Sequence, residues 1–222
     1  GHTLSHDQVR EAEPLLQSHV LGGVLFPDEA QIEPLLATSA VATQFESRGG
    51  KIFNGHEAFE FVLNGRGHIQ SVRTTQGTYF PQLVVLAGGS WSPGLTRKLG
   101  IKTPILGGKG YSMTLVGAKQ TPKRPIMIVE RKIAITPFQD KLRVAGTLEL
   151  VNQEFGISPK RLDAVIRGTH EYLSLTTPAT PELRDIWRGL RPCTPDGVPM
   201  IGFSNKVPNL FYCTGHQMLG LQ

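Results

Sequence analysis

Three short segments carry residues that could hold a small ligand. Residues 86–92 read L-A-G-G-S-W-S, a buried strand opening into glycines, and glycines at such a turn let a backbone pass close to a ligand. Residues 187–197 read W-R-G-L-R-P-C-T-P-D-G, where Arg191 stands beside a proline and can present two parallel N–H donors to a carboxylate. Residues 215–220 read G-H-Q-M-L-G, a glycine-bounded loop after an expected strand, which is well suited to close contact with a cofactor.

Each of these segments also has an ordinary structural explanation. The glycines at 88–89 suit any strand-to-helix turn, and Arg188 and Arg191 suit a surface beside a turn at 195–197. A lone histidine such as His216 is more often structural than catalytic. From the residue types alone, these alternatives stay open.

Other familiar sites do not occur in the sequence. The dinucleotide fingerprint needs three glycines spaced G-x-G-x-x-G in a strand-to-helix turn, but G-R-G at 65–67 is followed by Gln70, and G-K-G at 108–110 by Met113. There is no Walker A loop, no G-x-S-x-G elbow and no metal-ligand spacing of cysteine or histidine. On spacing alone, the sequence predicts no nucleotide site and no metal site.

The composition is that of a folded protein without a membrane span. Hydrophobic residues make up 39% and charged residues 18% of the 222, and no apolar run approaches the roughly 20 residues that cross a bilayer. The net charge is +5, but the basic residues are scattered and no nucleic-acid motif accompanies them, so we predict no nucleic-acid partner. Two cysteines, which suit reduced buried thiols, and a polar N-terminus predict a cytoplasmic location.

The pattern of apolar residues predicts a mixed α/β fold with an inserted, mostly antiparallel part. The continuous apolar run at 83–89 fits a strand buried on both faces in a parallel sheet. The chain begins with an α/β pattern, continues with a mostly β part, and ends with short buried strands again. The simplest explanation is one domain inserted into another, and the inserted domain would hold roughly residues 101–184 in a separate sheet. The other expected elements are helices at 7–17 (capped by Asp7), 34–48 and 158–173, strands at 51–57, 58–64, 68–74, 111–116, 126–130, 133–136, 142–148, 198–203 and 210–213, and turns at 64–65 and 138–141.

Five segments in this order resemble the FAD-dependent D-amino-acid oxidase/dehydrogenase family, which includes glycine oxidase and sarcosine oxidase. The likeness is greatest to the bacterial D-amino-acid dehydrogenase type. The segments are F-P-D-E-A at 26–30, V-V-L-A-G-G-S-W-S at 84–92, K-G-Y-S at 109–112, G-L-R-P-C-T-P-D-G-V-P-M-I-G at 189–202 and G-H-Q-M-L-G at 215–220.

The resemblance implies part of an FAD-binding Rossmann-like domain with an inserted antiparallel β-sheet substrate domain. We therefore predict a segment associated with the substrate domain at 1–25, FAD-domain portions at 26–100 and 185–222, and the inserted substrate domain at 101–184. The family begins with a G-x-G-x-x-G turn and continues past the G-H-x-x-L-G loop. We therefore expect a piece cut at both ends, with weak or absent FAD binding of its own.

Carried over residue by residue, the resemblance implies that Arg191 and Tyr111 bind the substrate, with Arg191 on its carboxylate. It also places the cofactor along two turns, which must then lie side by side. No certain catalytic acid or base and no metal ligand is implied, because the flavin carries the hydride chemistry. The implied cofactor contacts are Gly88, Gly89, Trp91, Gly215, His216, Met218, Leu219 and Gly220.

The implied activity is the oxidation of a D-amino acid, or a small secondary amino acid, by hydride transfer to flavin to give a 2-oxo acid. Oxidase-type members carry a substrate-binding tyrosine where this chain has Ala134, which favours the dehydrogenase type. The alternatives are a glycine- or sarcosine-type flavin oxidase and a non-catalytic fragment that serves binding or assembly. The electron acceptor (quinone or oxygen) stays open, as does peripheral contact of the full-length enzyme with the inner face of the cell membrane.

Overall fold

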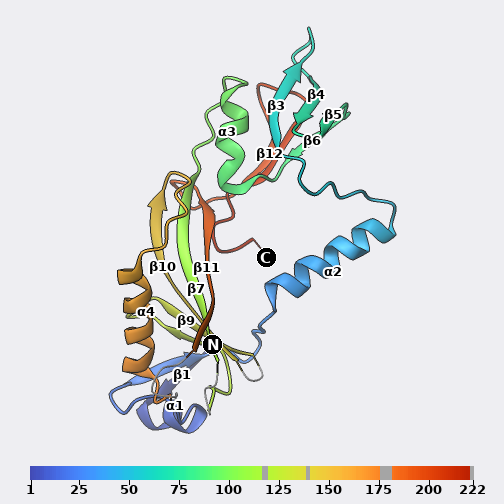
Figure 1. The fold of residues 1–222 in the computed structure, drawn as a ribbon. Helices are drawn as coiled ribbons and strands as arrows, with labels where there is room; N and C mark the ends of the chain where they lie inside the picture. The colour runs from blue at the N-terminus through green and yellow to red at the C-terminus, as the bar shows by residue number, and fades with distance from the viewer. Residues whose placement is uncertain (117–119, 139–140, 176–181, 221–222) are drawn as a thin grey trace. The chain divides into compact units, whose positions relative to one another are not determined.

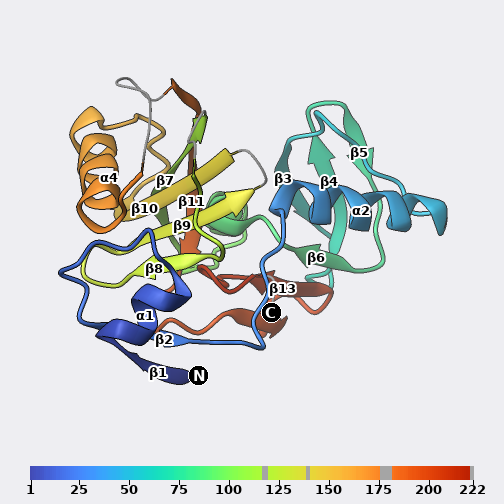
Figure 2. The same cartoon turned by 90° about the horizontal axis from the view of Figure 1, so that it is seen from below.

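The computed structural model describes residues 1–116, 120–138, 141–175 and 182–220. The chain has a mixed α/β fold with several antiparallel sheets, as the sequence predicts (Figure 1, Figure 2). It divides into two compact units: unit 1 holds residues 1–31, 109–149 and 155–189, and unit 2 holds residues 32–108, 150–154 and 190–222. The four-part domain assignment drawn from the sequence stays a prediction.

Unit 1 is built on a five-stranded sheet with the strand order β11-β7-β10-β9-β8. Strands β8, β9 and β10 pair antiparallel, and Ile135 of β9 lies opposite both Val144 and Ile126. The strands predicted in this region are present, and β7 and β10 extend beyond their predicted bounds. The strands are β7 (Leu106–Val116), β8 (Ile126–Ile128), β9 (Ile133–Phe138), β10 (Lys141–Val151) and β11 (Glu182–Cys193). One end each of β7, β10 and β11, namely residues 106–108, 150–151 and 190–193, belongs to unit 2.

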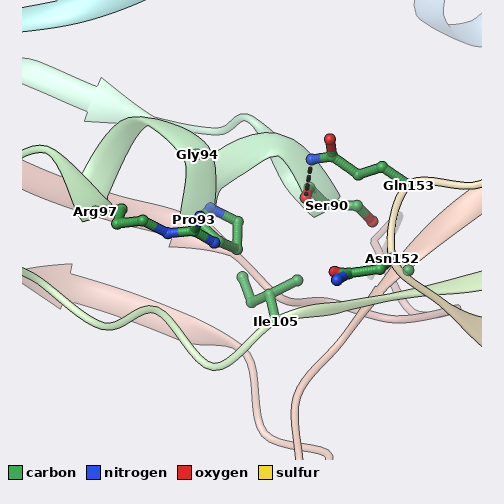
Figure 3. Close-up of a pocket in the computed structure, with 8 residues that line it drawn as sticks. Ser90, Pro93, Gly94, Arg97, Ile105, Asn152 and Gln153 are labelled. Atoms are coloured by element: carbon green, nitrogen blue, oxygen red, sulfur yellow. Dashed lines mark hydrogen bonds between the residues drawn. The ribbon is translucent and has the colours of Figure 1, made fainter.

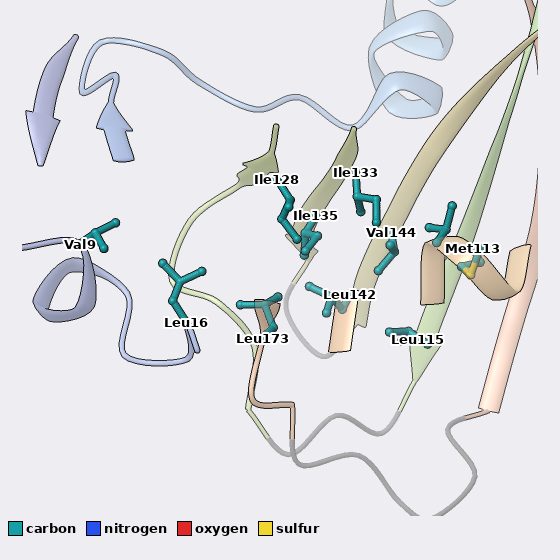
Figure 4. Packing of buried hydrophobic residues seen from close by; sticks show 11 residues of the cluster. Val9, Leu16, Met113, Leu115, Ile128, Ile133, Ile135, Leu142, Val144 and Leu173 are labelled. Atoms are coloured by element: carbon teal, nitrogen blue, oxygen red, sulfur yellow. The ribbon is translucent and has the colours of Figure 1, made fainter. Parts of the chain in front are cut away.

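The core of unit 1 consists of aliphatic side chains from the sheet, from helix α4 (Pro159–Tyr172) and from the N-terminal segment (Figure 4). Ile133 and Ile135 of β9 and Leu142 of β10 are at most 1% exposed, because alternate residues of a strand enter the same face of a sheet. Val165 of α4 joins them from the helix. Apolar burial of this kind is the main contribution to the stability of the unit.

The N-terminal helix differs from the prediction at both ends. Helix α1 (His6–Ala12) lies between β1 (His2–Ser5) and β2 (Gly22–Leu25), and it is capped by Ser5 rather than by Asp7. The Ser5 hydroxyl accepts from the Gln8 N–H at 3.4 Å, and the Gln8 side-chain oxygen accepts from the Ser5 N–H at 2.9 Å. The helix stops before Pro14, because a proline disfavours the helical conformation of the residue before it.

A surface ion pair in unit 1 gives a pH-dependent prediction. Arg131 donates from Nε and Nη2 to the Glu171 carboxylate at 2.9 and 2.7 Å, and these hydrogen bonds lower the pKa of Glu171 and raise the pKa of Arg131. A lowered carboxyl pKa contributes stability above the ordinary glutamate pKa, and this contribution is lost as the pH falls through the lowered value. We expect Arg131→Gln to return the Glu171 pKa toward its ordinary value in an NMR titration of the side-chain carboxyl carbon.

The matched control for this titration is Arg73→Gln. Arg73 forms a different surface pair, with Glu60 at 2.9 Å in unit 2, and its loss should leave the Glu171 pKa where it is in the unchanged chain. A Glu171 pKa that does not move in Arg131→Gln would show that the Arg131 pair does not persist in solution.

Unit 2 contains two three-stranded sheets. Strands β3 (Ala58–Leu63), β4 (Ile69–Thr74) and β5 (Gly77–Tyr79) pair antiparallel in chain order. Strands β12 (Met200–Phe203), β13 (Leu210–Thr214) and β6 (Val84–Leu86) form the second sheet in the order β12-β13-β6. The predicted turn at 64–65 is present, and the Asn64 side-chain oxygen holds it by accepting from the Arg66 and His68 N–H groups at 2.9 and 3.1 Å.

Asn209 joins the two sheets of unit 2. Its side-chain oxygen accepts from the Ile69 N–H at 2.8 Å, and its amide nitrogen donates to the carbonyls of Ile69 at 2.9 Å and Gln82 at 3.2 Å. Asn209 is only 9% exposed, so these bonds satisfy polar groups that burial would otherwise leave unpaired. The small apolar core beneath includes Leu86 and Leu210.

Helix α2 (Pro34–Ser47) of unit 2 matches the predicted helix within a residue. Glu33 caps it, since its carboxylate accepts from the Leu35 and Leu36 N–H groups at 2.7 and 3.1 Å. The apolar spacing that predicts the helix does not bury it, however, because none of its residues is buried and Val41 is 70% exposed.

One strand prediction in unit 2 is wrong, and a second is confirmed only in part. Residues 51–57 are not a strand, because the chain turns at Asn54-Gly55, where Gly55 has the left-handed φ of +75°. Strand β6 is shorter than the predicted 83–89 and is buried on one face alone, since Leu86 is 4% and Val85 is 55% exposed. The turn expected at 138–141 includes residues 139–140, which lie outside the described residues.

Candidate functional site

Two neighbouring parallel strands of unit 2 end at the same edge of their sheet. Strand β13 pairs with β6 in parallel, and Tyr212 lies opposite Leu86 at the last paired position. The chain leaves β6 through residues 87–89 and leaves β13 through residues 215–216. Ligands of open α/β sheets bind at the carboxyl ends of the strands. The side-by-side arrangement expected for the two glycine-containing turns is therefore present.

Both turns need glycine at a particular position. Gly89 has φ +54° and Gly215 has φ +82°, in the left-handed region that side chains disfavour. A Cβ on Gly89 would meet nothing within 4 Å, so the backbone there is open to a ligand. A Cβ on Gly215 would lie 2.9 Å from Cγ2 of Thr194, so this glycine allows the second turn to approach residue 194.

Three residues with buried hydroxyl groups, Ser90, Ser92 and Thr214, lie next to these turns. We call them the hydroxyl cluster. The three residues are at most 4% exposed. Ser92 Oγ lies 3.4 Å from Thr214 Oγ1, which donates to the Gly89 carbonyl at 3.5 Å. Ser90 Oγ donates to the Leu190 carbonyl at 3.3 Å. The cluster thus connects the first turn to the end of β13 and to β11.

Arg191 lies on β11 between two residues that are bonded to these turns. Leu190 accepts the bond from Ser90, and Pro192 accepts a 3.2 Å bond from the Gln217 N–H of the second turn. Arg191 is half-buried, and this burial lowers the pKa of its guanidinium. The electrostatic interaction with Cys193 raises that pKa, but by less. Arginine nevertheless stays protonated in proteins, so the site holds a partly desolvated cation.

The other predicted cofactor contacts differ in exposure. Trp91 is 50% exposed at the end of the short helix η1 (Gly89–Trp91), which is followed by helix α3 (Ser92–Arg97). His216 is half-buried, whereas Met218 and Leu219 are 70% and 57% exposed, and Gly220 is also exposed. These side chains are accessible to a ligand, and their roles as cofactor contacts stay predictions.

Tyr111, the second predicted substrate ligand, belongs to unit 1 and is 1% exposed. Its hydroxyl donates to Glu149 at 2.5 Å and accepts from the Ser158 N–H at 3.3 Å. Lys109, also 1% exposed, donates to the Gly156 carbonyl at 2.9 Å, and Arg161 lies 3.1 Å from Glu149. These contacts fix the position of the Tyr111 side chain, and its role as a substrate contact stays a prediction.

The hydroxyl cluster and Gln153 are absent from the residues that the sequence singles out. Gln153 donates from Nε2 to the Ser90 carbonyl at 3.2 Å and so ties a loop after β10 to the first turn. Ser90 and Ser92 lie inside the G-G-S-W-S segment, and polar residues that follow two glycines at a turn were a usable signal. Gln153 gives no such signal, because its partner lies 63 positions away in the sequence.

The hydroxyl cluster yields a stability prediction. We expect Ser90→Ala to lower the free energy of unfolding by about 1 kcal/mol, because the part-buried Leu190 carbonyl loses its donor. Urea unfolding followed by circular dichroism measures this change. Ser71→Ala is the control, since Ser71 is 6% exposed on β4 and lies outside the cluster; equal losses in the two variants would contradict a specific role for Ser90.

The whole chain matches a known family. All 222 residues match the family described as FAD dependent oxidoreductase. The chain belongs to the FAD-dependent oxidoreductase family. The resemblance seen in the sequence segments is therefore confirmed at the level of the family.

Relatives within this FAD-dependent family are identical to the chain at about a third of the aligned positions. A D-amino acid dehydrogenase of Rhizobium rhizogenes is 33% identical over 222 residues, which cover 98% of this chain and 52% of that protein. A D-amino acid dehydrogenase of Sinorhizobium medicae is 34% identical with the same coverage. The chain thus spans about half the length of the curated relatives it matches.

Solved structures of the same fold agree with the family assignment. Glycine oxidase from Bacillus cereus superposes with a TM-score of 0.84 at 26% identity, covering 99% of this chain and 59% of that one. L-proline dehydrogenase from P. horikoshii superposes with a TM-score of 0.82 at 21% identity, with 99% and 60% coverage, and shows the fold alone.

The two turns suit the flavin end of the FAD that the family binds. Gly89 leaves open space where a side chain would stand, so a flat ring can lie against the main chain. In this fold the pyrophosphate is held by a G-x-G-x-x-G turn, and that motif does not occur in the 222 residues. The open backbone at Gly89 therefore fits a flat ring such as the flavin, and the role of the two turns as a flavin site stays a prediction.

The described residues of this chain contain no group of three or more histidine, cysteine, aspartate or glutamate residues arranged to hold a metal ion. Cys193 and Cys213 are both free and half-buried. No helix in the described ranges is long and apolar enough to cross a membrane.

Proposed function

We propose that the protein carrying this chain oxidises a D-amino acid, or a small secondary amino acid, in an FAD-dependent reaction. The amino acid loses a hydride from its α-carbon and a proton from its nitrogen, and water hydrolyses the imino acid to a 2-oxo acid and ammonia or an amine. FAD, when bound, supplies the hydride acceptor. The D-amino acid dehydrogenases at 33% and 34% identity support this class of substrate.

The observation that carries the proposal is the position of Arg191 on β11. Its two neighbours, Leu190 and Pro192, are hydrogen-bonded to the two turns proposed to face the flavin. A half-buried guanidinium held beside a flavin would bind the substrate carboxylate through two parallel hydrogen bonds and so fix the α-carbon near the ring. No general acid or base is required for this orientation.

The cofactor contacts in the proposal come from the two turns. Gly88, Gly89 and Trp91 would line one side of the flavin ring system, and the loop from Gly215 to Gly220 the other. His216, Met218 and Leu219 are the side chains of that loop available for contact, and their exposure leaves room for a ligand. Substitution of the exposed Met218 or Leu219 tests this contact through the visible spectrum of bound FAD.

The experiment that tests the activity is an assay of the full-length, FAD-loaded protein against a panel of D-amino acids, glycine, sarcosine and D-hydroxyproline. We expect turnover with at least one D-amino acid and a quinone or dye as acceptor, since Ala134 stands where oxidases carry a tyrosine. No turnover with any member of the panel would contradict the proposal.

A glycine-oxidase-type activity is the second candidate, and the superposition on glycine oxidase with a TM-score of 0.84 favours it. It predicts glycine or sarcosine as the preferred substrate and oxygen as an efficient acceptor. Comparing rates with oxygen and with a quinone in the same assay separates the two activities. Contact of the enzyme with the membrane surface is part of the dehydrogenase proposal alone. A quinone acceptor is dissolved in the lipid, so the enzyme must reach the membrane surface to reduce it, whereas oxygen is available in water.

The 222-residue chain by itself is expected to show negligible turnover. It contains no G-x-G-x-x-G turn for the pyrophosphate, so FAD would lose the contact that anchors it. The purified chain should therefore be colourless and inactive, and a non-catalytic binding or assembly role of this piece would agree with that result. A yellow chain that oxidises amino acids would prove this expectation wrong.

A further inference from the structure

We propose that unit 2 contains a second ligand site, a pocket for a short organic carboxylate that adjoins the first of the two turns assigned to the flavin. The pocket has a volume of about 280 Å³ and is lined by η1 and α3, by the start of β7 and by residues 152–153 after β10. Ligand pockets usually have volumes of about 300–1,000 Å³, so this one suits a small molecule.

Two side chains with hydrogen-bond donors face one another across the pocket. Figure 3 shows Arg97 of α3 and Asn152 pointing toward each other, with Ile105 between them. Within the described residues, neither the Arg97 guanidinium nor the Asn152 side-chain amide has a hydrogen-bond partner. A guanidinium and an amide N–H2 together offer donors to both oxygens of a carboxylate.

The charge around the pocket favours an anion. None of the lining residues is acidic, and Arg97 is the one charged side chain among them. The chain as a whole carries a net charge of +5, so the long-range field attracts anions as well. Ile105 and Pro93 add apolar surface beside the donors, which favours an organic carboxylate with a short carbon chain over an inorganic oxyanion.

The loop that carries Asn152 is held in place before any ligand arrives. Gln153 has a φ of +55°, a left-handed conformation that is costly for a residue with a side chain. Its amide donates to the Ser90 carbonyl at 3.2 Å, and Ser90 is itself buried and bonded to the Leu190 carbonyl. Because this contact fixes residue 153, the preceding Asn152 is positioned opposite Arg97, and preorganisation of this kind favours binding.

The test is an NMR titration of the 222-residue chain with propionate, with the neutral isostere propionamide and with inorganic phosphate. We expect saturable shifts of the amide resonances of Gly94, Gly107 and Gln153 with propionate, and a dissociation constant on the order of millimolar, as suits a ligand of so few atoms. Propionamide should bind at least about tenfold more weakly, because it lacks the charge that Arg97 recognises.

Variants separate the pocket from general attraction of anions to a basic chain. Arg97→Gln should weaken propionate binding by about tenfold or more, and Asn152→Ala by about threefold. Arg66→Gln and Asn205→Ala are the matched controls, since both residues are exposed in unit 2 away from the pocket, and binding should be unchanged.

Three results would overturn the site: no saturable binding of propionate, equal binding of propionamide, or unchanged binding in Arg97→Gln. Tighter binding of phosphate than of propionate would overturn the assignment to an organic carboxylate. The titration uses the chain without FAD, so its outcome does not depend on the proposed oxidation of amino acids.

Discussion

Replacing Arg191 with alanine is expected to raise the KM of the FAD-loaded enzyme for its amino acid more than tenfold. A charge-assisted pair in a closed site contributes roughly 2–5 kcal/mol to binding, and alanine removes both of its hydrogen bonds. The half-buried guanidinium strengthens this expectation, because partial loss of solvent makes each bond to a carboxylate stronger. Steady-state kinetics over a range of substrate concentrations measure the change.

Two further variants make the Arg191 result specific. Arg191→Lys keeps the charge but loses the planar fork, so we expect a smaller rise in KM than for alanine. Arg66→Ala removes an exposed arginine of the same unit and should leave KM unchanged. An unaltered KM in Arg191→Ala, with FAD still bound, would remove Arg191 from the substrate site.

The largest expected effect on stability comes from Gly215→Ala. The residue has φ +82°, which costs an ordinary residue about 1–2 kcal/mol, and its new Cβ would lie 2.9 Å from Cγ2 of the buried Thr194. Crowding of this kind in a packed region adds about 1–3 kcal/mol, so we expect a total loss of about 2–5 kcal/mol. Urea unfolding of the 222-residue chain measures it.

Gly65→Ala is the matched control for this substitution. Its φ does not lie in the left-handed region, and a Cβ there would meet nothing within 4 Å. We therefore expect a change within about 0.5 kcal/mol, as is usual for a surface substitution. Equal losses in the two variants would mean that the approach of the second turn to Thr194 is not required for stability.

The sequence predicts those parts of the fold that rest on local patterns. Helical spacing at 34–48 locates α2, and the Asn64-Gly65 pair locates the turn after β3. The continuous apolar run at 83–89 locates the shorter strand β6, which has the predicted parallel neighbour. The resemblance to the family also predicts that the two turns meet, and the structure agrees, because the parallel strands β6 and β13 end at one edge of their sheet.

The parts that sequence reasoning missed depend on particular contacts, some local and some between distant residues, that residue types alone do not decide. Ser5 competes with Asp7 as the helix cap, and the reciprocal bond with Gln8 decides between them. Residues 51–57 have strand-like composition, but the turn at Asn54-Gly55 prevents pairing. Tyr111 sits in a motif shared with the family, and its burial against Glu149 emerges only when β7 and β10 are placed together.

The most direct measurement is a crystal structure of the FAD-loaded, full-length protein with a non-reacting carboxylate analogue of the amino acid. We predict that the flavin ring lies against the backbone of residues 88–89 and of residues 215–216, with the carboxylate of the analogue held by both terminal nitrogens of Arg191. A flavin ring bound elsewhere, or an Arg191 side chain that faces solvent while the carboxylate binds to other residues, would contradict this arrangement.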